Sequence, residues 1–321
     1  MMDNIFEFLK VSSLSKDSFN EKVEFLIDDF LVKELITLIY ADGGTGKSYI
    51  AFALTKKLCE IGQKVFFIDY DNPASVLKQR GIDKLLIEKF NNLSYIQRSQ
   101  ITLNGYELVL KLEESAVGKA YKNCVFVLDS LRDFTDVYND NKINRLFEAL
   151  KNLREAGATI IILHHSNKDG KNYQGSNHIR NSIDSMYHLI KRPSKENELN
   201  FLLEVQKERA GIKDIGFSID TLNLELNSLD VDVARMNEYE INFTSSALKI
   251  LAQGDMNKTE LLNAMGYEKD DKTARDCLDK FEGNLWTSTK AGKAIVYSSK
   301  KEATTITTDT TIAKDSLFLA V

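Results

Sequence analysis

YADGGTGKS, residues 40–48, ends in Gly-Lys-Ser, as a phosphate-binding loop does. The usual pattern G-x-x-x-x-G-K-[ST] has a glycine at the position that Ala41 occupies in this chain. An apolar run precedes the segment and a helix-like run follows it, so backbone N–H groups and a helix N-terminus would converge on one anion. A strand–turn–helix with an exposed lysine is the alternative interpretation.

The residue types of this loop suit a nucleotide. Glycines let a backbone curl around phosphate without Cβ clashes. Lys47 would neutralise the β- and γ-phosphates, and Ser48 would offer a hydroxyl to Mg²⁺. We therefore expect seven consecutive residues to contact the nucleotide: Gly43, Gly44, Thr45, Gly46, Lys47, Ser48 and Tyr49.

The composition is that of an ordinary globular protein, with 321 residues, 43% hydrophobic residues and a net charge of −5. No apolar run is long enough to span a membrane and no export signal is recognisable, so we expect a cytoplasmic protein without membrane contact. Its three cysteines fit reduced thiols. The acidic total argues mildly against a surface built wholly for nucleic acid.

The hydrophobic pattern predicts an α/β fold. Helix-like segments, such as 47–61 and 141–156, separate short apolar runs, which predicts a mostly parallel sheet covered by helices on both faces. The five runs are ELITLIY (34–40), KVFFID (64–69), LSYIQ (93–97), CVFVLD (124–129) and TIIILHH (159–165). Four later runs, SMYHLIK, NFLLEVQ, IGFSID and LNLELN, follow one another closely, and we expect them to extend the sheet as antiparallel strands.

A second domain is predicted near the C-terminus. Three short helix-like segments (244–254, 257–266 and 271–283) precede a hairpin-like segment (285–299), an order typical of a small winged-helix α+β domain. The predicted organisation is an N-terminal segment (1–24), a main domain (25–235), a winged-helix-like domain (241–300) and a disordered tail (301–321). The tail ends in LFLAV, either a docking peptide or a frayed end.

Acidic residues follow two of the predicted strands. Asp129 ends CVFVLD, where the second nucleotide motif needs an acid to hold Mg²⁺ together with Ser48; a helix cap is the alternative role. Asp69 and Asp71 follow the strand after the loop's helix, and one of them, with Asp71 favoured, could orient the attacking water. Both could instead be turn residues, because DNPAS is typical turn chemistry.

His164 and His165 end the run TIIILHH. Neighbouring residues on a strand point to opposite faces, so one of them could face the γ-phosphate while the other faces the core. No further ligands lie at zinc spacing. A strand-end histidine with a satisfied hydrogen bond is the alternative.

Together these motifs resemble those of the RecA/DnaB-type P-loop ATPases, most closely the plasmid RepA-type hexameric helicases, over residues 25–211. The resemblance implies a RecA-like fold that binds ATP and Mg²⁺. DNPASVLKQR is similar to the family segment with the water-orienting acid, which falls on Asp71; the family usually has Glu there. VFVLDS resembles the second nucleotide motif, and IIILHHSNK resembles the motif that ends in a γ-phosphate sensor, which falls on His165.

The resemblance also implies an oligomer that acts on DNA. GSNHIRNSID (175–184) is similar to the segment after a DNA-facing loop, which would be 167–174 with Lys168 and Lys171 as phosphate contacts; a solvated loop is the alternative. VQKERAG resembles the K-x-R-x-G segment that reaches a neighbouring subunit's nucleotide. Arg209 would then be an arginine finger acting in trans, with Lys207 beside it. A surface strand with two solvated cations is the alternative.

The predicted winged-helix-like domain carries cations on its third helix and its hairpin turn, namely Lys272, Arg275, Lys280, Lys290 and Lys293. These side chains could contact DNA phosphates. Residues 241–300, however, hold nine Lys/Arg and eight Asp/Glu, and protein contact is the alternative role.

Three functional hypotheses follow. The first is a hexameric, ATP-driven motor on single-stranded DNA, a RepA-like replicative helicase of a plasmid, phage or mobile element that works with replication proteins. The second is an ATP-switched accessory protein, such as a loader, with little unwinding. The third is a RecA-type recombinase that forms filaments. All three share these motifs, so the sequence separates them poorly.

Overall fold

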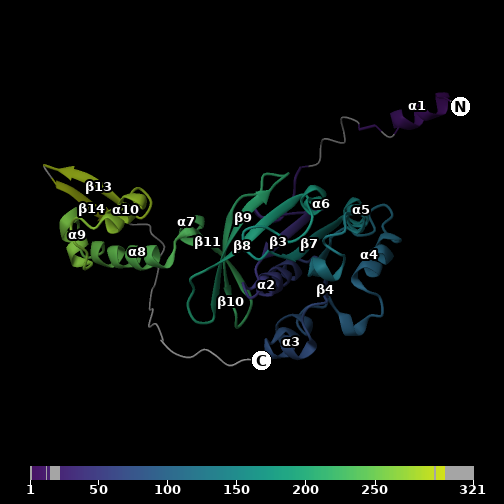
Figure 1. Cartoon of the computed structure of the whole chain (residues 1–321), viewed down its shortest axis with the longest axis horizontal. Coiled ribbons are helices and arrows are strands. Elements are labelled where there is room, and N and C mark those ends of the chain that lie inside the picture. The colour runs from purple at the N-terminus through teal and green to yellow at the C-terminus, as the bar shows by residue number, and fades with distance from the viewer. Residues whose placement is uncertain (1, 12, 15–21, 293, 301–321) are drawn as a thin grey trace. The chain divides into compact units, whose positions relative to one another are not determined.

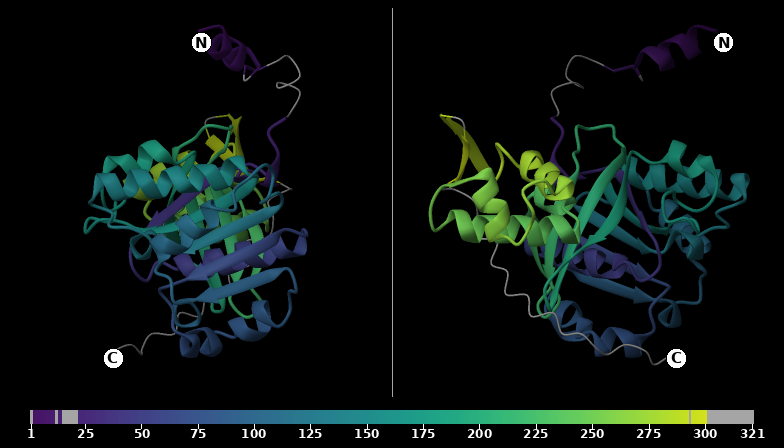
Figure 2. Two further views of the ribbon diagram at one scale, coloured as in Figure 1. Left: turned by 90° about the vertical axis from the view of Figure 1, so that its right-hand side faces the viewer. Right: turned by 60° about the vertical axis from the view of Figure 1, so that its left-hand side comes forward.

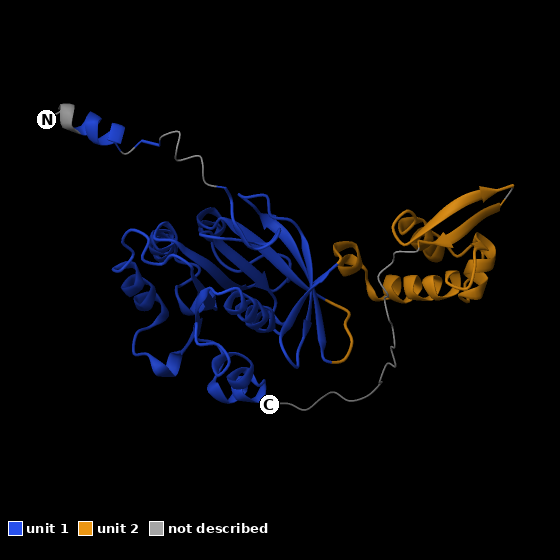
Figure 3. Ribbon diagram, turned by 180° about the vertical axis from the view of Figure 1, so that it is seen from behind, with its two compact units in different colours: residues 1–191, 197–229 blue, residues 192–196, 230–321 orange. Residues whose placement is uncertain are grey.

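The computed structural model describes residues 2–11, 13–14, 22–292 and 294–300 (Figure 1). The chain divides into two compact units, which are described separately (Figure 3). Unit 1 comprises residues 1–191 and 197–229, and unit 2 comprises residues 192–196 and 230–321. The predicted tail (301–321), its LFLAV end and Lys293 lie outside the described residues.

Unit 1 is built on a nine-stranded sheet with the order β11-β10-β9-β8-β3-β7-β6-β4-β5. Its strands are β3 (Ile36–Ala41), β4 (Lys64–Asp69), β5 (Leu93–Gln97), β6 (Cys124–Asp129), β7 (Ala158–His165), β8 (Ser185–Arg192), β9 (Glu198–Lys207), β10 (Ile215–Asp220) and β11 (Glu225–Leu229). The six strands from β8 to β5 pair in parallel. The prediction of a mostly parallel α/β sheet is thus confirmed.

The expected direction of one strand was wrong. β8, the run SMYHLIK, was predicted to be antiparallel, but it pairs with β3 in parallel. The chain leaves β7, forms α6 (Asn177–Ser182) and returns on the other side of β3. A strand that re-enters a sheet through such a crossover runs parallel to its neighbour. Antiparallel pairing joins β9 to β10 and β10 to β11, as predicted for those three runs.

Helices cover both faces of this sheet, as expected (Figure 2). Side chains of α2 (Lys47–Glu60) belong to one buried cluster, and those of α4 (Gly105–Glu113) and α5 (Asp140–Glu155) belong to the other. On β3, Ile39 faces the first cluster and Leu38 the second. Full burial of such a side chain contributes about 1.5–3 kcal/mol, which explains why the central strands are continuously apolar.

The remaining elements of unit 1 are short. They are α1 (Met2–Val11), β1 (Phe25–Ile27), β2 (Leu31–Val32), α3 (Ala74–Gln79), the π-helical turn η2 (Asp83–Ile87) and the 3₁₀ turns η3 (Arg98–Gln100) and η4 (Leu131–Asp133). β1 and β2 form a two-stranded sheet of their own. Among the described residues, no helix combines the length and the apolar character needed to cross a bilayer.

Unit 2 contains four helices and a three-stranded sheet in its described part. The elements are α7 (Val231–Arg235), α8 (Glu238–Leu251), β12 (Met256–Asn257), α9 (Lys258–Ala264), α10 (Lys272–Lys280), β13 (Trp286–Ala291) and β14 (Ala294–Ser299). Asn237 and Asn257 start α8 and α9 with capping boxes. The fully buried Trp286 lies in the core of this unit. The winged-helix assignment of these elements remains a prediction.

Candidate active site

The glycine-rich loop joins the central strand β3 to α2, as its sequence predicts. Gly46 has φ +109°, and a Cβ atom built there would lie 2.8 Å from the Phe201 ring. Glycine is therefore the residue that this position accepts without strain. Ala41 is the last residue of β3 and fully buried, so its small side chain sits in extended backbone that does not require glycine.

Lys47 turns back toward its own loop. Its Nζ donates hydrogen bonds to the carbonyl oxygens of Ala41, at 2.9 Å, and Asp42, at 2.7 Å. The residue is 8% exposed. Burial lowers the pKa of its ammonium, and the negative charges of Asp129, Asp42 and Asp71 oppose that shift. A buried ammonium at the N-terminus of α2 is a suitable partner for a phosphate group.

Ser48 and Asp129 meet between α2 and β6, where Ser48 Oγ donates to Asp129 Oδ2 at 3.3 Å. Asp129 is 2% exposed. Burial, and then the charges of Asp69 and Asp71, raise the pKa of its carboxyl to about 7. A nearby cation would stabilise the ionised form. A hydroxyl and a carboxylate are oxygen donors that Mg²⁺ accepts, so this pair fits the predicted ion.

The two aspartates after β4 have different surroundings. Asp69 is fully buried and accepts hydrogen bonds from the backbone N–H groups of Asp71 and Asn72, at 3.0 and 2.8 Å. It also accepts one from the Tyr95 hydroxyl at 2.6 Å. These hydrogen bonds stabilise the turn that follows β4, as the turn interpretation expects. The Asp71 side chain is 37% exposed and pairs with Arg132 Nη2 at 3.1 Å.

Arg132 is a residue of this site that the sequence analysis missed. It lies on η4, directly after β6, and pairs with Asp71 across the ends of β4 and β6. Its positive charge contributes to the lowered pKa of both Lys47 and His165. A signal was available, because a cation three residues after Asp129 falls at the same edge of the sheet.

The two histidines at the end of β7 have different environments, as strand geometry predicts. His164 is buried, and its Nε2 donates to the carbonyl oxygen of Gln174 at 2.6 Å. His165 is partly exposed, and its Nε2 is buried without a hydrogen-bond partner among the described residues. Burial, together with Lys47 and Arg132, lowers the His165 pKa to about 4, so the imidazole is neutral at pH 7.

Exposed lysines lie on the loop that follows β7. An antiparallel β-bridge pairs Ser166 with Tyr173 at the two ends of this loop, and Asn167 N donates to the Asn172 carbonyl oxygen at 2.7 Å. The side chains of the predicted DNA contacts, Lys168 and Lys171, are exposed. Lys272 and Arg275 are exposed on α10 and therefore belong to unit 2.

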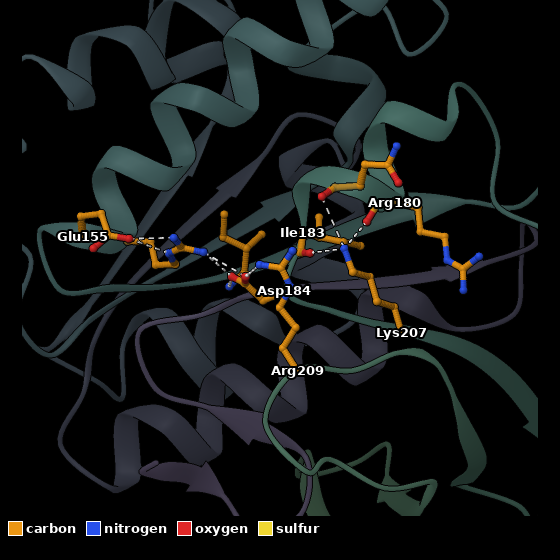
Figure 4. A network of polar contacts seen from close by, with 9 residues as sticks. Glu155, Arg180, Ile183, Asp184, Lys207 and Arg209 are labelled. Atoms are coloured by element: carbon orange, nitrogen blue, oxygen red, sulfur yellow. Dashed lines mark hydrogen bonds and ion pairs between the residues drawn. The ribbon is translucent and has the colours of Figure 1, made fainter. Parts of the chain in front are cut away.

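Lys207 and Arg209 contact residues 180–184 of the same chain (Figure 4). Lys207 Nζ donates to the carbonyl oxygens of Arg180 and Ile183, at 2.5 and 2.7 Å. Arg209 Nη1 pairs with Asp184 at 3.2 Å, while 55% of the Arg209 side chain is exposed. Neither cation is among the main influences on the pKa values of Lys47 and Asp129.

Comparison with known proteins gives one family match. The model of the CobQ/CobB/MinD/ParA nucleotide binding domain matches residues 36–274. A solved structure described as an ATPase domain is similar with a TM-score of 0.49 and 12% sequence identity, over 72% of this chain and 99% of that chain. The search of curated proteins returned no match.

Proposed function

This chain belongs to the family of CobQ/CobB/MinD/ParA nucleotide binding domains. From that premise we propose that it is an ATPase that uses the energy of ATP hydrolysis to act on single-stranded DNA. Family membership confirms the prediction of a P-loop NTPase. The RepA-type resemblance, helicase activity and a hexameric ring remain parts of the proposal. The observation that carries the ATPase assignment is the contact of Ser48 with Asp129 beside the buried Lys47.

The proposed chemistry assigns one role to each side chain. Residues 43–49 surround the phosphates, and Lys47 exchanges its bonds to loop carbonyls for bonds to phosphate oxygens. Ser48 and Asp129 would hold Mg²⁺, which when bound neutralises phosphate charge. Asp71 orients the attacking water. The neutral His165 imidazole donates a hydrogen bond from its buried Nε2 to an oxygen of the γ-phosphate.

The position of Arg209 supports a site shared between subunits. Its exposed guanidinium pairs with Asp184, and no described contact joins it to its own phosphate-binding loop. An arginine in this position could serve a neighbour's nucleotide, where its planar fork stabilises the charge of the transition state. We propose a homo-oligomer, a hexameric ring by resemblance, in which Arg209 and Lys207 act in trans.

The proposed nucleic acid partner is single-stranded DNA, and this assignment rests on the family resemblance rather than on charge alone. The exposed Lys168 and Lys171 support phosphate contacts by the loop after β7. On α10, Lys272 and Arg275 add two exposed cations, but Asp276 and Asp279 lie exposed on the same helix. The winged-helix-like unit therefore serves equally well as a contact for replication proteins.

The test is the steady-state ATPase rate across protein concentrations that span assembly, with and without single-stranded DNA. We expect stimulation by DNA, a more than linear rise with protein concentration, and loss of activity in Lys47→Ala and Arg209→Ala. Lys213→Ala removes another exposed cation of unit 1 and serves as the matched control. If Lys47→Ala is inactive while Arg209→Ala and DNA change nothing, the ATP-switched accessory protein is the better account. Filaments that pair homologous strands would instead favour the recombinase.

A further inference from the structure

Asp184 is a buried carboxylate shared by two arginines and a backbone N–H group (Figure 4). It follows α6, and its side chain is 2% exposed. Arg154 Nη1 lies 2.9 Å from each of its oxygens, and Ile36 N donates to Oδ2 at 3.0 Å. Arg209 Nη1 makes the remaining contact, 3.2 Å from Oδ1.

The two arginines hold Asp184 unequally. The Arg154 side chain is 20% exposed and reaches both oxygens, whereas the Arg209 side chain is 55% exposed and reaches one. A buried carboxylate needs a compensating charge and hydrogen bonds, and Arg154 and the Ile36 N–H supply both. Asp184 is therefore neutralised without Arg209. The contact between Asp184 and Arg209 therefore acts mainly by restricting the orientation of Arg209, the more exposed partner.

A second attachment fixes the backbone that carries Arg209. Lys207 Nζ donates to the Arg180 and Ile183 carbonyls, and Arg180 Nη2 donates to the Gln206 carbonyl at 2.9 Å. These bonds tie the end of β9 to the chain just before Asp184. The backbone position from which the Arg209 side chain extends is thus held in place.

We propose that Asp184 is a positioning residue for Arg209: it holds one nitrogen of the guanidinium, so that the remaining donors face a neighbouring subunit's nucleotide in a fixed orientation. A guanidinium has five N–H donors, and the contact with Asp184 engages one of its three nitrogens. An unconstrained arginine would have to be ordered at each turnover. This inference rests on the proposed trans-acting role of Arg209.

Asp184 could instead act within its own subunit. Its bond to Ile36 N lies at the start of β3, the strand that leads into the phosphate-binding loop. Subunit mixing separates the two possibilities. A Lys47→Ala subunit has a defective loop but an intact Asp184 and Arg209, so it can complete the site of a neighbour that lacks only the finger function.

The experiment uses full-length Asp184→Asn, whose amide oxygen can still accept the bond from Ile36 N. Arg154 keeps its 2.7 Å pair with Glu155, so the substitution does not leave Arg154 without a partner, whereas Arg209 loses its carboxylate. We expect kcat to fall about 10- to 100-fold, with the affinity for a fluorescent ADP analogue unchanged. Mixing with Lys47→Ala should raise activity above the sum of the two variants alone. Glu155→Gln, which alters the same network without touching Arg209, should leave kcat unchanged.

Mixing Arg209→Ala with Lys47→Ala is the reference. If that pair regains activity but Asp184→Asn with Lys47→Ala does not, Asp184 acts inside its own subunit and the inference is wrong. If neither pair regains activity, the trans-acting site itself fails. Wild-type kcat in Asp184→Asn would also overturn the inference. Should that variant not fold, as judged by circular dichroism, Asp184→Asn with Arg154→Gln removes both charges, and the same outcomes decide.

Discussion

Replacing Asp129 with asparagine should stabilise the nucleotide-free protein, although it removes a residue that the proposed chemistry needs. Asp129 is 2% exposed, and burial with the nearby charges of Asp69 and Asp71 disfavours its ionised form. Asparagine has nearly the same shape and can still accept the hydrogen bond from Ser48, but it carries no charge. The substitution therefore removes an unfavourable buried charge from the folded state.

The size of the effect follows from the two pKa values, 3.8 for an unperturbed carboxyl and about 7 in the folded protein. The folded state binds the proton more tightly, so the aspartate's contribution to stability is fully present below pH 3.8 and is lost as the pH rises through about 7. Asparagine does not titrate. The gain in unfolding free energy should be about 1 kcal/mol near pH 4.5 and about 4 kcal/mol near pH 8.

Urea unfolding of the wild type and Asp129→Asn, without nucleotide and with EDTA, measures this difference at both pH values. Far-UV circular dichroism follows both units. Trp286, the single tryptophan, belongs to unit 2, so its fluorescence provides an internal reference that the substitution should not shift. Asp28→Asn, at an exposed carboxylate, is the matched control.

A gain of equal size at both pH values, or a loss of stability near pH 8, would refute the reasoning, because neither follows from a buried charge. A shift seen only in Trp286 fluorescence would place the effect in the wrong unit. Adding ATP and Mg²⁺ should reverse the order of stability, since a ligand that binds the folded wild type stabilises it by mass action.

Gly46→Ala should weaken binding of a fluorescent ATP analogue at least about tenfold, because its Cβ would meet the Phe201 ring at 2.8 Å with φ at +109°. Gly62→Ala, also at positive φ but with open space around it, should bind normally, and equal affinities would contradict the argument. Gly175→Ala would place a Cβ 2.5 Å from the Val137 carbonyl oxygen and should lower the unfolding free energy by at least about 2 kcal/mol in urea titrations; a change within about 0.5 kcal/mol would show that the backbone can shift.

Much of unit 1 could be predicted because its signals are local. A strand buried on both faces is largely apolar, so the runs that became β4 and β6 were recognisable with their bounds. The run that became β5, a partly exposed strand at the edge of the sheet, was also recognisable with its bounds. The loop before Lys47 was recognisable because its residue types have few other uses. The direction of β8 could not be predicted, because the hydrophobic pattern does not indicate which strand it will pair with.

The missing parts of the site depend on contacts between distant residues. Asp69 and Asp71 are two residues apart, and the Tyr95 hydroxyl, which belongs to another strand, is part of what distinguishes their environments. Asp184 lay within a segment singled out for its resemblance, yet its partners Arg154 and Ile36 come from other elements. No periodicity or motif spacing reports such pairings.

The bonds from Lys47 to the carbonyls of Ala41 and Asp42 make nucleotide entry an exchange of partners. Phosphate oxygens must displace acceptors that the loop itself supplies, so a measured affinity is a difference between two bonded states. The same lysine also cross-links the two ends of the turn while no nucleotide is present. Loss of activity in Lys47→Ala therefore has two causes, the loss of a positive charge beside the phosphates and a less constrained loop backbone. Amide hydrogen exchange across residues 42–46, which reports on the loop backbone alone, would separate the two.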